Sequence, residues 1–185
     1  MIEMYLFVAP TCPSCLTAER AVTKVADGLT QKVRVKFIPY LQLGVINNSE
    51  QQIDYQIMLD YKAALFQGCK KGRMFLQHLQ TQIINQNQAY SEALVNDAAK
   101  ATHLDLEMFQ EDRHSDLPLS AFKSDQALIR EMNVPSHDNL VIFNCSSCAN
   151  GLLVKDLDYD HLHKLCDQME QQMQPATDNP NLRVL

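Results

Sequence analysis

The chain has 185 residues, of which 46% are hydrophobic and 21% charged, so it has enough apolar material for a buried core. Its net charge of −6 argues against a nucleic-acid-binding surface, because such surfaces are basic. No apolar stretch is long enough for a transmembrane helix, and no charged or apolar leader precedes the first predicted strand. We therefore expect a cytoplasmic protein without membrane association.

Residues 2–8, 13–27 and 32–40 predict a strand, a helix and a second strand. The first segment is a short apolar run, and the third alternates apolar with basic side chains, which is the period of a strand. Pro13 suits the first position of the helix, since a backbone N–H there has no intrahelical partner. Two strands joined through a helix are expected to be parallel.

From 51 to 133 almost every segment has helical spacing, with Ser91 as a candidate N-cap. Residues 139–144 and 151–156 then predict two short strands that form a hairpin. Asp158 is placed to cap a last amphipathic helix. This order of elements predicts one four-stranded sheet flanked by helices, with a helical block between its second and third strands.

The six cysteines are Cys12, Cys15, Cys69, Cys145, Cys148 and Cys166. Structural disulfides are rare in the reducing cytoplasm, so we interpret the cysteine pairs first as redox-active thiols or metal ligands.

The stretch "TCPSC" places Cys12 at the predicted N-cap of the first helix, where backbone N–H groups and the helix dipole favour a thiolate. Cys12 is therefore the predicted nucleophile. Cys15 lies on the same helical face and can close a disulfide with it, while Pro13 stiffens the turn and Ser14 completes it. We favour a redox dithiol. A metal site is a weaker alternative because no second ligand pair follows within the next 50 residues, and an incidental pair is the third.

A strand ending in Cys-Pro-Ser-Cys on a helix, with a helical block before a final strand–strand–helix unit, resembles the DsbA-type branch of the thioredoxin fold. Four segments, "IEMYLFVAPTCPSC", "YKAALFQGCKKGRMFLQHLQ", "LDLEMFQEDRHS" and "LVIFN", resemble the Spx adaptor family of Gram-positive bacteria. The similarity extends over residues 2–145.

The resemblance implies an α/β, thioredoxin-like (DsbA-type) fold, ordered β-α-β, helical insertion, β-β-α. Residues 1–50 and 134–175 would form the thioredoxin-like domain, 51–133 an inserted helical subdomain, and 176–185 a loose tail.

Two activities follow from the resemblance. One is thiol–disulfide exchange with protein or peptide thiols and disulfides, for which we expect no cofactor. The other is non-catalytic adaptor work, in which such proteins bind the transcription regulator Spx and promote its degradation by the ClpXP protease. Glutathione-linked isomerase chemistry is a third alternative on the same fold.

Thioredoxin-like folds place a cis-proline before the strand that faces the two cysteines, and its loop offers backbone groups to substrate peptides. Alignment of "LVIFN" puts Asp138 at that place, with Pro135 three residues too early. A cis bond before a non-proline residue costs about 2.5–4 kcal/mol, so we expect a trans bond and a reshaped loop. His137 and Asp138 would then lie close to Cys12. His137 is either a proton acceptor for Cys12, oriented by Asp138, or a solvated loop histidine.

Cys145 and Cys148 form a second CxxC in the predicted hairpin turn. They form a reversible disulfide, or bind zinc together with His163 and Cys166, or have no special role. We expect no metal, since core packing can hold the last helix and Cys166 fits that core. Cys69 is predicted to be a buried small hydrophobe.

Overall fold

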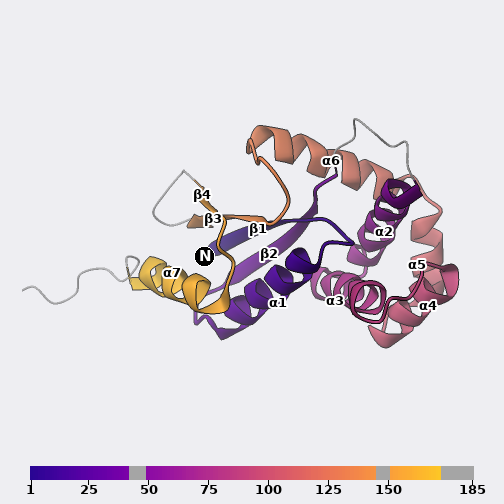
Figure 1. Ribbon diagram of the computed structural model, residues 1–185, viewed down its shortest axis with the longest axis horizontal. Helices are drawn as coiled ribbons and strands as arrows, with labels where there is room; N and C mark the ends of the chain where they lie inside the picture. The colour runs from indigo at the N-terminus through magenta and orange to yellow at the C-terminus, as the bar shows by residue number, and fades with distance from the viewer. Residues whose placement is uncertain (42–48, 145–150, 172–185) are drawn as a thin grey trace, which may run out of the picture.

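The computed structural model describes residues 1–41, 49–144 and 151–171, and Figure 1 shows one sheet with helices around it. The strands are β1 (Ile2–Val8), β2 (Val33–Pro39), β3 (Asn139–Asn144) and β4 (Leu152–Val154). The helices are α1 (Pro13–Gly28), α2 (Ser49–Leu65), α3 (Cys69–Gln80), the π-helical turn η1 (Thr81–Asn85), α4 (Glu92–Ala101), α5 (Leu106–Arg113), α6 (Leu117–Glu131) and α7 (Tyr159–Gln171).

The sheet has four strands in the order β2-β1-β3-β4. β1 pairs with β2 in parallel, Ile2 opposite Val33, as expected for strands joined through a helix. β3 runs antiparallel to both β1 and β4. The predicted α/β, thioredoxin-like order is therefore confirmed, and the predicted caps Ser91 and Asp158 accept backbone N–H groups at the starts of α4 and α7.

Alternate residues of β1 pack into two hydrophobic cores on opposite faces of the sheet. On one face, residues such as Met4 and Leu6 join the large core that also contains buried side chains of α1, α2, α3 and α7. On the other face, Phe7 packs with Ile129 of α6 and with Val141 of β3. α1 and α7 lie side by side on the first face (Figure 1), and both contribute buried side chains to the large core.

The helical block from α2 to α6 is joined to the edge strand β2 by side-chain hydrogen bonds to its carbonyls. Arg73 donates to the carbonyl of Val35 at 3.0 Å, and the Tyr61 hydroxyl donates to that of Phe37 at 3.1 Å. A Gln126 amide of α6 donates to the last carbonyl of the strand at 2.7 Å. An edge strand with its carbonyls occupied is a poor template for pairing with another chain.

Cys69 was predicted to be buried, and this is wrong, because it is exposed. α3 begins at Cys69, and its buried stripe starts one turn later, at Gly72.

None of the helices in the described ranges combines the length and apolarity that a membrane crossing requires. The predicted tail, 176–185, lies outside the described residues, and the boundaries of the two predicted subdomains stay a prediction.

Candidate functional site

Cys12 and Cys15 occupy the start of α1, directly after the loop that follows β1. Cys12 is the N-cap, with extended backbone (φ −90°, ψ 117°), and its sulfur accepts the backbone N–H of Cys15 at 3.4 Å. Cys12 is partly exposed, whereas Cys15 is completely buried behind it. The predicted cap is confirmed, and only one of the two thiols is open to a substrate.

The buried Cys15 sulfur has a polar environment of its own. The backbone N–H of Ala9 donates to it at 3.3 Å. Burial raises the pKa of the Cys15 thiol far above its ordinary value, the Ala9 N–H opposes this rise, and the nearby Cys12 and Asp138 add to it. The buried Cys15 thiol therefore holds its proton more tightly than an ordinary cysteine does.

The loop before β3 departs from a cis-proline loop as the sequence predicted. The described residues contain no cis peptide bond, so the bonds before Pro135 and Asp138 are both trans. Asp138 has a left-handed backbone (φ 67°), and its N–H donates to the carbonyl of Phe7 at 2.8 Å. Strained backbone of this kind persists only where surrounding contacts hold it.

Two side chains supply those contacts. The Asn139 amide donates to the carbonyls of Ser136 and His137 at 2.9 and 3.1 Å. The Tyr40 hydroxyl donates to the carbonyl of Pro135 at 2.9 Å. The loop therefore has a fixed path across the start of α1.

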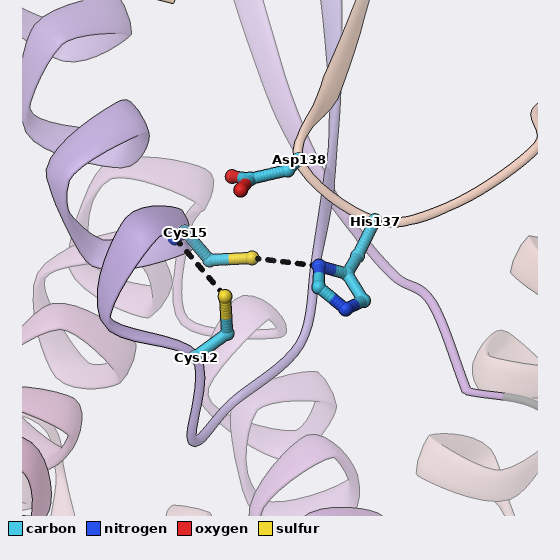
Figure 2. Close-up of side chains that lie close together, drawn as sticks. All are labelled: Cys12, Cys15, His137 and Asp138. Atoms are coloured by element: carbon cyan, nitrogen blue, oxygen red, sulfur yellow. Dashed lines mark hydrogen bonds between the residues drawn. The ribbon is translucent and has the colours of Figure 1, made fainter.

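This path brings His137 and Asp138 to the two cysteines (Figure 2). Nδ1 of His137 lies 3.6 Å from the Cys15 sulfur, so the imidazole contacts the buried thiol, whereas the sequence suggested a partner for Cys12. Asp138 accepts a hydrogen bond from the Ser14 hydroxyl, and the oxygen of that hydroxyl lies 3.0 Å from the Cys12 sulfur. Ligand-type atoms of Cys12, Cys15, His137 and Asp138 all lie within 4.8 Å of one another.

A pocket of about 310 Å³ opens beside this cluster. It is lined by Ser14, Thr17, Ala18, Asp138, Lys155, Leu157 and Asp158. Because Asp138 and Ser14 line the pocket and Ser14 contacts Cys12, a bound peptide in the pocket would lie against the exposed side of the site.

The second CxxC cannot be placed in the same way, since Cys145 and Cys148 lie outside the described residues. Of their suggested zinc partners, Cys166 is completely buried in the core, as predicted, and His163 pairs with Asp167 at 2.9 Å. A second disulfide and a zinc site there both stay predictions.

Glu19, one turn beyond Cys15 on α1, is a site-proximal residue that sequence reasoning missed. It is completely buried, and Oε1 accepts a hydrogen bond from the Gln80 amide at 2.9 Å. The available signal was an acidic residue on the apolar stripe of α1, between Ala18 and Val22.

A family model described as thioredoxin matches residues 5–165, and the chain therefore belongs to the thioredoxin family. It is a DsbA-like thioredoxin-fold protein whose sequence is similar to that of ClpXP adapter protein SpxH. The Staphylococcus aureus SpxH is 27% identical over 165 residues, covering 88% of this chain and 63% of the relative. SpxH of Staphylococcus saprophyticus is 28% identical with the same coverage. The chain thus spans less than two thirds of the length of these relatives.

Solved structures with the same fold include a proposed protein disulfide isomerase from Nitrosomonas europaea, with a TM-score of 0.73 and 12% identity over 93% of this chain and 98% of that one. The thiol-disulfide exchange protein α-DsbA2 from Wolbachia pipientis has a TM-score of 0.66 and 16% identity, covering 91% and 81%. At these identities the likeness shows the fold.

Proposed function

We propose that the chain is a cytoplasmic thiol–disulfide oxidoreductase of the DsbA or thioredoxin type, acting on protein or peptide thiols and disulfides. The observation that carries this proposal is the asymmetry of the dithiol. Cys12 is partly exposed at a helix N-terminus, and Cys15 is buried behind it with its backbone N–H on the Cys12 sulfur. This is the arrangement that an attacking and a resolving thiol need.

In the first step the Cys12 thiolate attacks one sulfur of a substrate disulfide, which breaks that S–S bond, releases one substrate thiolate and forms a mixed disulfide. In the second step Cys15 loses its proton and attacks the Cys12 sulfur. A Cys12–Cys15 disulfide forms, and the second substrate thiol leaves. The substrate gains two electrons and the protein loses them; in the opposite direction the same steps oxidise a substrate dithiol.

His137 has a role in the second step. Its Nδ1 lies 3.6 Å from the Cys15 sulfur, so a neutral imidazole can accept the Cys15 proton and return it to the departing thiolate. Because burial raises the pKa of Cys15, a base at this place would assist its deprotonation. Ser14, between Cys12 and Asp138, holds the exposed side of the site in place.

A second candidate function is that of a protease adaptor. The observation that favours it is the similarity to SpxH over 88% of this chain. In that case the folded surface binds a regulator such as Spx and presents it to ClpXP, and the dithiol is a sensor or has no catalytic part.

Capture of partner proteins with a Cys15→Ala variant distinguishes the oxidoreductase from the adaptor. Without the resolving thiol, substrates stay bound to Cys12 as mixed disulfides that reductant releases. The oxidoreductase proposal expects such clients, and expects none with Cys12→Ala/Cys15→Ala. A partner that survives reductant and binds the double variant equally supports the adaptor. If Cys15→Ala captures no clients that reductant releases, the oxidoreductase proposal is contradicted.

A further inference from the structure

The geometry of the cysteine cluster points to a second use of the same side chains. We propose that, in the reduced protein, Cys12, Cys15, His137 and Asp138 bind a divalent metal ion of the zinc type. Two thiols, one imidazole and one carboxylate are ligands that zinc takes in tetrahedral sites. This inference goes beyond the proposed function and does not rest on it.

The spacing of the four groups is close to that of a tetrahedral site. With Zn–S near 2.3 Å and Zn–N near 2.0–2.1 Å, the S···N edge of a tetrahedron is about 3.6 Å and the S···S edge about 3.8 Å. The Cys15 sulfur and His137 Nδ1 are 3.6 Å apart. All four ligand atoms lie within 4.8 Å of one another, so small side-chain rotations bring them to the distances of a tetrahedral site.

The charges of the cluster favour a cation. Cys12, Cys15 and Asp138 are all acidic groups, and their ligand atoms lie within 4.8 Å of one another. A bound dication stabilises two thiolates and a carboxylate together. Binding of the metal therefore releases protons from the thiols.

The backbone around the cluster is already arranged to support ligands. Ala9 and Cys15 each direct a backbone N–H at a cysteine sulfur, at 3.3 and 3.4 Å. The Ser14 hydroxyl donates to Asp138, and the loop that carries His137 is held by Asn139. Figure 2 shows the His137 ring facing the Cys15 sulfur, with the Asp138 carboxylate close to both cysteines. Such surrounding hydrogen bonds orient metal ligands and raise their affinity.

The metal and disulfide exchange compete for the same thiols. A metal-bound Cys12 is not a free nucleophile, and formation of the Cys12–Cys15 disulfide removes both thiolate ligands. If a low-molecular-weight disulfide oxidises the pair, two thiolates lose two electrons, the reagent becomes two thiolates, and the metal ion is released.

The test is a Co²⁺ titration of the reduced full chain, in a background carrying Cys145→Ser and Cys148→Ser so that the second CxxC cannot bind the probe. We expect one Co²⁺ per chain, with thiolate-to-cobalt charge-transfer bands and the intense visible bands of tetrahedral cobalt, and displacement by Zn²⁺. Cys12→Ser and the disulfide form should lose these bands. His137→Gln and Asp138→Asn should each weaken binding by at least about tenfold.

His114→Ala is the matched control, an exposed histidine outside the cluster, and should leave Co²⁺ affinity unchanged. Circular dichroism of each variant checks that it folds. The proposal is overturned if the thiolate-to-cobalt bands are absent, or if His137→Gln and Asp138→Asn bind Co²⁺ as tightly as the parent. These outcomes are independent of mixed-disulfide capture, which tests the oxidoreductase.

Discussion

Glu19 predicts an unusual dependence of stability on pH. Its carboxyl is completely buried on α1, and burial raises its pKa from 4.5 to about 8, against the opposing effects of the Gln80 hydrogen bond and of Arg20. Glu19 Oε2 and Gln80 Oε1 both lack a hydrogen-bond partner. A protonated Glu19 can donate from Oε2 to Gln80 Oε1 while Oε1 still accepts from the amide, which satisfies both groups.

The direction in which the free energy of unfolding changes with pH follows from proton binding to Glu19. Between pH 4.5 and 8 the folded protein keeps the Glu19 proton while the unfolded chain has lost it, so the free energy of unfolding falls as pH rises through this window. The free energy of unfolding falls by about 1.4 kcal/mol for each pH unit in this window. Glu19 therefore lowers it by up to about 4 kcal/mol between pH 5 and pH 8.

Glu19→Gln replaces the neutral acid with a neutral amide that can also pair with Gln80. Urea unfolding of both proteins, from pH 5 to pH 9, isolates the contribution of Glu19, because the other titrating groups are shared. We expect similar stability at pH 5, and a variant more stable by about 4 kcal/mol at pH 8 and above. Glu111→Gln, an exposed site on α5, is the matched control and should not change the pH dependence.

A constant difference between the wild-type protein and Glu19→Gln across this pH range would refute the reasoning. It would mean that Glu19 ionises alike in the folded and unfolded states, so that its burial does not suppress the charge. A variant less stable at every pH would show that Gln cannot replace the acid in its pairing with Gln80.

Arg113→Met removes a buried guanidinium that bonds to a buried aspartate on α2, and should lower the free energy of unfolding by about 3–5 kcal/mol, measured in urea. Gly72→Ala places a Cβ 2.6 Å from a leucine side-chain carbon and 3.0 Å from its Cα, so we expect a loss of about 1–3 kcal/mol, whereas Gly28→Ala, with nothing within 4 Å, should be neutral or slightly stabilising. In timed alkylation followed by mass spectrometry, Cys12 should be modified well before the buried Cys15, and equal rates would contradict the proposed division of roles.

Much of the fold was predictable because local signals agreed with one another. The alternation in β2, the cap at Ser91 and the Cys-Pro-Ser-Cys turn each determine a local structure with few alternatives. The sequence did not show that Cys69 is exposed, because helical spacing alone does not reveal where packing along a helix begins.

The makeup of the site was less predictable, because it depends on contacts between distant residues. No second pair of metal ligands follows the first CxxC within 50 residues, yet the antiparallel pairing of β1 with β3 brings in His137, which lies 122 positions beyond Cys15. Likewise, Glu19 is a lone acid on an apolar stripe until α3 supplies Gln80. Periodicity predicts which face of a helix is buried, and only the tertiary fold decides the partner of a polar group there.

Asp138 shows how one residue changes both the path and the chemistry of the loop. Proline fixes φ near −65° and has no N–H, so it can neither adopt the φ of 67° found here nor donate to the Phe7 carbonyl. With Asp138 in place, its N–H is used within the protein and is not offered to a substrate, while its carboxylate accepts from Ser14 and the preceding imidazole contacts the Cys15 thiol. In the proposed oxidoreductase, a peptide at this site would meet the side chains of Asp138 and Ser14, and Asp138 together with His137 would supply the two non-sulfur ligands of the proposed metal site.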